Sequence, residues 1–339
     1  MSNKKITLKD IANSLKVSIS TVSRALNNKP GVSKRLREEI VRLAQELGYT
    51  PDPLARALRG GQTKTIGVLV PELKGNFSAE ILESMEKSLY CLGYRLFLCP
   101  TEDDPEKEAE HLKILMRHKI AGVLAAPANV KDNYDLYNSI IAAGIPVVFF
   151  DRLVENVDTD YVISDNEEGM RMLMEYLISK GHRKIGFIHP LRGIYTSEKR
   201  LKVFLSYSDK VEIREEWIRD GRSTDEGGKE AFESIIYSSP RPTAIIVGSY
   251  GMMPGVLKAV KQHGIRVPQD ISIVGFDDAP WNEIFDPPIT CVDQDPRQIG
   301  LIAASILINR LENKRKNITK MQVVLKVRFI ERESVRELK

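Results

Sequence analysis

The chain has 339 residues, of which 42% are hydrophobic and 28% charged, so it is long enough for two or three domains with substantial cores. No apolar run approaches the ~18–20 residues of a membrane-spanning helix, and the start MSNKK lacks an apolar signal region, which argues against secretion and favours a cytoplasmic protein. The net charge of +4 is unevenly distributed, because residues 1–60 hold twelve basic and five acidic side chains while the remainder carries a net charge of −3.

The first 26 residues predict two short helices. Thr7 and Asp10 have the spacing of a capping box at the start of the first helix, and Ser18 is positioned to cap the second. In the second helix Val22, Ala25 and Leu26 face inward, which leaves an outward face that carries Ile19, Ser20, Thr21, Ser23 and Arg24. Two such helices joined by about three residues are typical of a helix-turn-helix, although a plain corner of a helical bundle has the same pattern.

A third helix and a short fourth one follow. Ser33 is placed to cap a helix that runs to about Leu47, where Gly48 supplies the stop. Asp52 and Pro53 open a further turn of helix that is too short to be stable alone in water. We therefore expect this last segment to fold only when a partner holds it.

From Thr63 onward short apolar runs alternate with amphipathic segments. A first series of strands is predicted at 65–71, 94–100, 122–127 and 146–151, and a second at 184–189, 244–248, 271–277 and 290–293. Apolar runs bounded by Gly and Pro and separated by helices indicate buried parallel strands. The predicted fold is an all-α head followed by an α/β body of two doubly wound parallel-sheet lobes, with crossing points at 161–165 and 290–294.

The segment from Ile6 to Lys64 resembles the lactose-repressor/galactose-repressor (LacI/GalR) family of bacterial transcription regulators. The resemblance lies in the order and spacing of VSISTVSR at 17–24, VS at 32–33, LGYTP at 47–51 and LARALR at 54–59, and it continues through the rest of the chain. It implies a helix-turn-helix domain at 1–50, a hinge helix and linker at 51–63, a first lobe at 64–162 with 293–321, and a second lobe at 163–292 with 322–339. It also implies an effector domain similar to periplasmic sugar-binding proteins.

The resemblance and the basic head together predict a DNA-binding surface. A positively charged head suits phosphate contact, and base edges are reached from the outward face of the second helix. Leu58 is expected, by resemblance, to wedge into the minor groove at the centre of a palindrome. The predicted DNA-binding residues are Thr7, Ser18, Ile19, Ser20, Thr21, Ser23, Arg24, Asn27, Ser33, Ala55, Leu58 and Arg59.

The resemblance also implies a small-molecule site between the lobes, at the carboxyl ends of the strands. Carboxylates and arginines there suit a polyhydroxylated ligand, and an aromatic face covers the C–H surface of a sugar. The predicted effector-binding residues are Phe77, Asp151, Arg152, Asp165, Thr196, Arg200, Tyr250, Asp277 and Gln294.

Structural alternatives stay open for several of these residues. Asp165 and Arg200 carry opposite charges and could pair with each other to brace the cleft. Asp151 and Arg152 could instead form a salt bridge between the lobes. Ser249-Tyr250 replaces the Asn-Asp or Gly-Asp usual in the family, and Ser78 stands where a second aromatic is common. These departures predict a pocket that is roomier on one side.

We expect a homodimeric transcription regulator that acts as a repressor, binds a palindromic operator and responds to a sugar or sugar derivative. The alternative is a catabolite-control regulator triggered by a protein corepressor. No nucleotide-binding or hydrolase motif is present, so we expect neither an enzyme nor a cofactor. The three cysteines, Cys91, Cys99 and Cys291, lack metal-ligand spacing, so no metal site is expected.

Overall fold

The computed structural model describes residues 6–49, 63–313 and 319–339, and the chain divides into two compact units, Met1–Thr63 and Lys64–Lys339. The hinge and linker expected at 51–63 therefore lie outside the described residues, apart from Thr63. None of the described helices is both long and apolar enough to cross a membrane.

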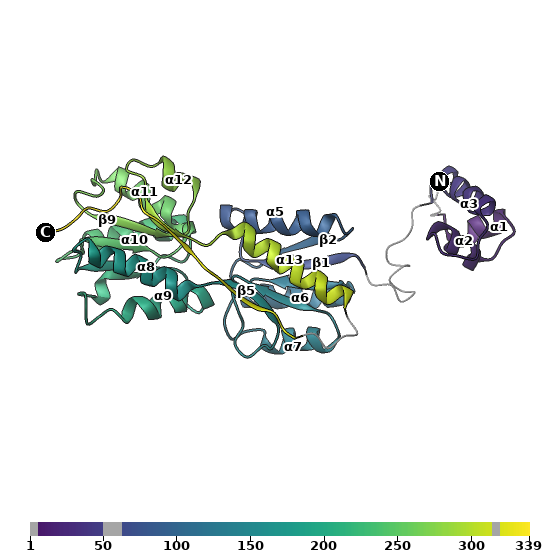
Figure 1. Ribbon diagram of the computed structural model, residues 1–339, viewed down its shortest axis with the longest axis horizontal. Coiled ribbons are helices and arrows are strands. Elements are labelled where there is room, and N and C mark those ends of the chain that lie inside the picture. Colours follow the sequence, from purple (N-terminus) through teal and green to yellow (C-terminus); the bar gives the residue numbers. More distant parts are fainter. Residues whose placement is uncertain (1–5, 50–62, 314–318) are drawn as a thin grey trace. The chain divides into compact units, whose positions relative to one another are not determined.

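The described part of the first unit contains three helices around a small core (Figure 1): α1 Leu8–Ser14, α2 Ile19–Leu26 and α3 Lys34–Glu46. The expected caps are present, since Thr7 and Asp10 form the capping box of α1, and Ser18 and Ser33 accept hydrogen bonds at the starts of α2 and α3. The core consists of the buried side chains Ile11, Ala12, Val22, Ala25, Ile40 and Ala44. The helix-turn-helix arrangement expected from the sequence is confirmed.

The first lobe of the second unit is built on a parallel sheet with the strand order β11-β5-β4-β3-β1-β2. Its strands are β1 Thr65–Val70, β2 Arg95–Pro100, β3 Gly122–Ala125, β4 Val147–Phe150, β5 Asp160–Ser164 and β11 Gln322–Leu325. Its helices are α5 Asn76–Tyr90, α6 Pro105–Arg117, α7 Tyr134–Ala142 and α13 Pro296–Glu312. Helices α5 and α13 pack side by side over one apolar face (Figure 1), and α6 and α7 cover the other.

The second lobe repeats this arrangement with the strand order β12-β10-β9-β8-β6-β7, in which only the short β12 is antiparallel to its neighbour β10. Its strands are β6 Ile185–His189, β7 Ile218–Asp220, β8 Ala244–Val247, β9 Ser272–Phe276, β10 Thr290–Asp293 and β12 Arg328–Ile330. Its helices are α8 Asn166–Ser179, α9 Tyr195–Leu205, α10 Asp225–Ile236, α11 Met253–Gln262 and α12 Pro280–Ile284, with 3-10 turns η1 Glu215–Trp217 and η2 Tyr250–Met252. The two doubly wound lobes are thus confirmed.

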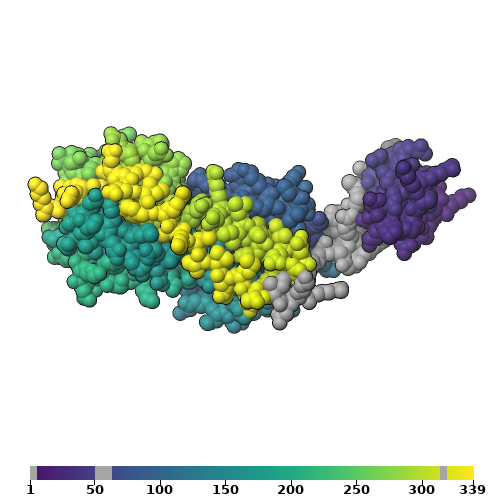
Figure 2. Space-filling model, viewed as in Figure 1, coloured from purple at the N-terminus to yellow at the C-terminus, as the bar shows by residue number. Residues whose placement is uncertain are grey.

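The described chain passes between the lobes after β5, after β10 and after β11. The third passage corrects the expected domain boundaries, because Gln322–Leu325 pairs in parallel with Tyr161–Ser164 in the first sheet, so residues 322–325 belong to the first lobe. The segment beyond it continues onto the second lobe (Figures 1 and 2), where β12 pairs with β10 and Leu338 N donates to Lys180 O. A four-residue edge strand carries too little periodicity to reveal its sheet, which is why the sequence placed it wrongly.

Candidate functional site

The N-terminus of α2 is organised by three hydroxyl groups. Ser18 Oγ accepts a hydrogen bond from Thr21 N at 3.1 Å and lies 2.7 Å from Ser20 Oγ and 2.8 Å from Thr21 Oγ1. The hydroxyls of Ser20 and Thr21 therefore have intramolecular partners before any ligand binds. The backbone amides of this first helical turn form a site that favours phosphate.

The face of α2 expected to point outward is only partly exposed. Ile19 is 40% exposed, and Ser20 and Arg24 are exposed as well, whereas Thr21 and Ser23 are half-buried. This exposure leaves Ile19, Ser20 and Arg24 as the side chains of α2 best able to reach a base edge. Thr7, Ser18, Asn27 and Ser33 are exposed at helix ends, while Ala55, Leu58 and Arg59 lie outside the described residues.

Arg37 is a residue of this unit that the sequence did not single out. Its Nη1 donates to Asn28 Oδ1 at 2.6 Å and to Ala25 O at 3.3 Å, and its Nη2 donates to Lys29 O at 2.7 Å. Arg37 thus closes the C-terminus of α2 and the turn after it, where backbone carbonyls have no partner within the helix. Its position one turn into a charged helix gives no signal that distinguishes it from a surface arginine.

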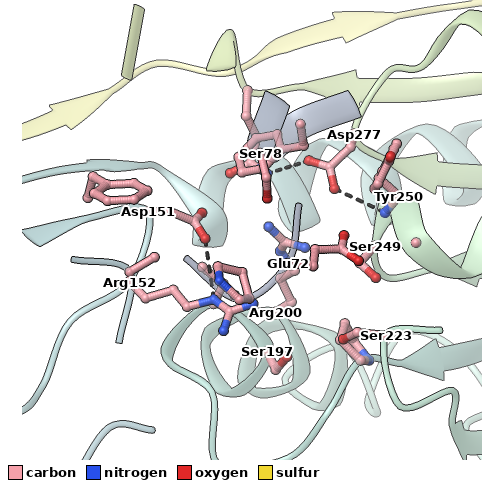
Figure 3. A pocket seen from close by; sticks show the side chains of 18 residues that line it. Glu72, Ser78, Asp151, Arg152, Ser197, Arg200, Ser223, Ser249, Tyr250 and Asp277 are labelled. Atoms are coloured by element: carbon pink, nitrogen blue, oxygen red, sulfur yellow. Dashed lines mark hydrogen bonds and ion pairs between the residues drawn. The ribbon is translucent and has the colours of Figure 1, made fainter. Parts of the chain in front are cut away.

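The second unit contains a pocket of about 80 Å³ between the two lobes (Figure 3). It lies at the carboxyl ends of strands from both sheets, as doubly wound lobes predict. Eight of the nine predicted effector-binding residues line it: Phe77, Asp151, Arg152, Thr196, Arg200, Tyr250, Asp277 and Gln294. Their proximity is thereby established, and their contact with a ligand stays a prediction.

Arg200 is the most firmly held cation of the pocket. Its side chain is 3% exposed, its Nε donates to Asn166 Oδ1 at 2.8 Å, and its Nη1 donates to Gly248 O at 2.7 Å. The guanidinium carbon also lies 3.5 Å from the centroid of the Phe276 ring, a cation–π contact. Burial lowers the pKa of Arg200, while Asp277 and Asp151 raise it.

Asp165, the ninth predicted residue, does not line the pocket. Its carboxylate caps α8 by accepting a hydrogen bond from Glu168 N at 3.0 Å. The expected pairing of Asp165 with Arg200 is wrong, because the neighbouring Asn166 supplies the oxygen that holds Arg200. The helical turn that starts at Asn166 directs the two adjacent side chains in different directions.

Asp277 ends β9 in a left-handed backbone conformation with φ of +78°. It is 7% exposed and accepts hydrogen bonds from Tyr250 N at 3.1 Å and from Gln294 Nε2. Burial raises the pKa of Asp277, against the opposing effects of Arg200 and these two hydrogen bonds. Asp277 thus joins the ends of three strands of the second sheet.

Asp151 and Arg152 follow β4 in the first lobe. Arg152 forms an ion pair with Asp103 through Nη1, and its Nε lies 3.3 Å from Asp151 Oδ2. Burial raises the pKa of Asp151, with Arg152 and Arg200 acting in the opposite direction. All three paired residues belong to one lobe, so the alternative of a salt bridge between lobes is wrong for Asp151 and Arg152.

Tyr250 belongs to the second lobe, and its side chain contacts the first lobe. Its hydroxyl accepts a hydrogen bond from the backbone N–H of Asn76, and its ring centroid lies 5.1 Å from that of Trp281. Gly75 leaves room for it, since a Cβ at Gly75 would lie 2.9 Å from the Tyr250 ring. The phenol thus lies against Gly75 and Asn76, and the expectation of a roomier side beside Ser78 stays a prediction.

Other polar residues of the pocket escaped the sequence analysis. They are Glu72 and Ser223, which follow strands, and Ser197, which lies on α9. Glu72 stands two residues after β1, and this place at a strand end was the signal available in the sequence. The serines carry no such signal, because serine is common in every loop.

Comparisons with known proteins agree with this architecture. Residues 7–52 match the family model for bacterial regulatory proteins of the lacI family, and residues 174–335 match that for a periplasmic binding protein-like domain. The chain is similar to the HTH-type transcriptional repressor PurR of Mannheimia succiniciproducens, with 32% identity over 91% of this chain and 92% of the relative. It is also similar to the ribose operon repressor of Haemophilus influenzae, with 31% identity over 98% and 99% of the two chains.

Among solved structures, the lac repressor dimer bound to operator and the anti-inducer ONPF superimposes with a TM-score of 0.83 and 25% identity, covering 98% of this chain and 100% of the other. One conclusion follows from the described helix-turn-helix, the two lobes built on parallel strands, and this identity along almost the whole chain. The protein belongs to the lacI family of bacterial regulatory proteins and is a DNA-binding transcriptional repressor.

Proposed function

We propose that the protein is a cytoplasmic homodimer that binds a palindromic operator and releases it when a small polyhydroxylated effector enters the interlobe pocket. In this proposal the protein catalyses no reaction and needs no cofactor besides its effector. The similarity to a lac repressor dimer on its operator supports the assembly, and the name of the ribose operon repressor supports a carbohydrate-related target.

The observation that supports the effector proposal is that both lobes contribute charged side chains to the pocket. Asp151 and Arg152 come from the first lobe, whereas Arg200 and Asp277 come from the second, and all four line one pocket. A ligand that contacts all four side chains therefore gains or loses contacts when the lobes change their relative position. Its differential affinity for the two lobe arrangements is then sufficient to shift the equilibrium between them.

Tyr250 lines the pocket from the second lobe and contacts the first, because its hydroxyl accepts a hydrogen bond from the backbone N–H of Asn76. A ligand in the pocket therefore lies beside a contact between the lobes, which is what an effector-controlled repressor needs. The first strand of the first lobe directly follows the linker, so a lobe movement reaches the DNA-binding unit through the chain.

The test has two stages with the full chain. An operator is selected from random double-stranded DNA, and effectors are found by a thermal-shift screen of sugars and sugar derivatives. Operator titrations with and without the effector should differ by about five- to 150-fold in affinity. Operator affinity unchanged by every sugar that binds would favour the protein-corepressor alternative.

Asp277→Asn provides the site-specific variant, because asparagine tolerates the left-handed conformation at this position. We expect it to bind the operator normally and to lose most of the effector response. Asp209→Asn, an exposed aspartate in the same lobe, is the matched control. Release of DNA by Asp277→Asn at the wild-type effector concentration would remove Asp277 from the site.

A further inference from the structure

Carboxylates outnumber guanidinium groups around the interlobe pocket. Glu72, Asp151 and Asp277 line it, and Asp103 lies directly behind Arg152. Against these four stand Arg152 and Arg200 within the pocket, and the exposed Lys74 near Glu72. With all groups ionised, the pocket itself carries an excess of negative charge.

The two arginines are also largely committed to protein partners. Arg152 is paired with Asp103 and Asp151. Arg200 donates through Nε to Asn166 and through Nη1 to Gly248 O, and its guanidinium group lies over the Phe276 ring. Among the described residues, Nη2 of Arg200 has no hydrogen-bond partner, so it is a guanidinium donor that a ligand can engage, and the buried Nε of Arg152 likewise has no hydrogen bond.

One buried acceptor of the pocket lacks a donor. Gln294 is 2% exposed and donates through Nε2 to Asp277, but its buried Oε1 has no hydrogen-bond partner among the described residues. The buried Oγ of Ser249 is likewise unpartnered within the described chain. A buried polar group without a partner is costly, so Gln294 Oε1 favours a ligand that brings a hydrogen-bond donor, while the hydroxyl of Ser249 can donate or accept.

The pKa directions agree with this excess of carboxylates. Burial and the neighbouring Asp103 raise the pKa of Glu72, and burial raises those of Asp151 and Asp277. A ligand phosphate or carboxylate would add a further negative charge within a few ångströms of these groups and would bring no donor for Gln294. Ligand hydroxyls or an ammonium group meet both requirements.

We propose that the effector of this pocket is an uncharged or amine-bearing polyol and that the pocket discriminates against sugar acids and sugar phosphates. The proposal rests on the proposed function and narrows its ligand class. The negative charges of Glu72, Asp151 and Asp277 favour a ligand that carries no negative charge of its own.

The test uses the full chain and matched series of sugars in thermal-shift and calorimetric titrations. The series are D-ribose with D-ribose 5-phosphate, and D-glucose or D-galactose with the corresponding amino sugar, uronic acid and 6-phosphate. In a series that binds, we expect the neutral or amino member to bind at least about tenfold more tightly than its acidic members. Tighter binding of an acid or phosphate, or binding by no neutral or amino sugar, would overturn the proposal.

Selection of an operator by the same preparation tests the proposed function separately, because DNA binding does not depend on the ligand's charge. A protein that selects an operator and then binds a sugar phosphate most tightly would retain its regulatory function and lose only the present inference.

Glu72→Gln tests the electrostatic basis, because Glu72 is half-buried and its loss removes one charge with little change of shape. We expect the ratio of neutral to acidic affinity to fall by roughly tenfold in this variant. Glu110→Gln, which removes an exposed charge on α6 outside the pocket, should leave the ratio unchanged. An unchanged ratio in Glu72→Gln would show that the carboxylate of Glu72 does not set the discrimination.

Discussion

The hydroxyl of Tyr250 accepts a hydrogen bond from the backbone N–H of Asn76, and the two residues belong to different lobes. Asn76 is the first residue of α5, whose N–H has no partner within the helix. The second lobe thus supplies a cap for a helix of the first lobe at the rim of the pocket. This contact makes the helix end sensitive to the relative position of the lobes.

Tyr250→Phe should remove this hydrogen bond while the ring keeps its contact with Trp281. A neutral hydrogen bond contributes about 0.5–1.5 kcal/mol, so amide exchange at Asn76 should accelerate by roughly two- to tenfold. The measurement is hydrogen exchange of the full chain. Tyr237→Phe, which loses a surface hydrogen bond to His263, is the control, and equal exchange at Asn76 in both variants would disprove the interlobe contact.

Arg37→Met should loosen the end of α2, because three oxygen acceptors lose their donor. We expect the local free energy of opening to fall by about 1–3 kcal/mol, with faster amide exchange at the turn that follows Asn27. The readout is hydrogen exchange without DNA. Arg35→Met, on the exposed side of the same helix, serves as the reference and should leave this turn unaffected.

Arg24→Ala should weaken operator binding by about 1–3 kcal/mol and relax the preference at one base position in each half-site. The reason is that Arg24 is an exposed arginine on α2, the helix expected to enter the major groove. Binding is measured on the selected operator and on random DNA at the same salt concentration. If affinity falls equally on both, Arg24 contacts phosphate and does not read a base.

His182 should make stability depend on pH. Its ring is fully buried between Thr243 Oγ1 at 2.8 Å and the carbonyl of Arg336 at 3.1 Å, and burial lowers its pKa to about 4. Because the unfolded pKa is about 6.5, the unfolded chain takes up a proton first as the pH falls. The contribution of His182 is thus present above about pH 6.5 and is lost as the pH falls toward 4, up to roughly 3 kcal/mol.

Urea unfolding at several pH values measures this effect. Wild-type stability should decline more steeply between about pH 6.5 and 4 than that of His182→Gln, which has no titratable ring. Parallel curves would show that His182 does not carry the dependence. The comparison isolates His182, because the raised pKa values of Glu108, Asp151 and Asp277 act with the opposite sign and are common to both proteins.

Local sequence signals predicted much of this fold. Helix starts at Leu8, Ile19 and Lys34 follow from the capping residues before them, since a cap acts within three residues of the chain. Eight strands follow from short apolar runs, and seven of them lie inside the sheets, where burial on both faces demands such runs, whereas β2 is a largely exposed edge strand. The same runs end in several of the polar residues that line the pocket, whereas Phe77, Thr196 and Arg200 lie on helices and were indicated by the resemblance to the LacI/GalR family.

The contacts within the pocket depended on the tertiary structure. Arg200 binds Asn166 rather than Asp165, Tyr250 reaches Asn76, and Glu108, on an amphipathic helix, is fully buried with hydrogen bonds from Tyr137 and Asn133. Each of these contacts joins residues 25 to 174 positions apart in the chain, and the choice between neighbouring side chains depends on the direction of a helical turn. The sequence therefore determined the elements and the residue types at their ends, because those depend on neighbours in the chain. Which polar groups meet was decided by packing of the lobes, because a hydrogen bond requires its two atoms to lie within about 3.5 Å, a precision that no periodic pattern encodes.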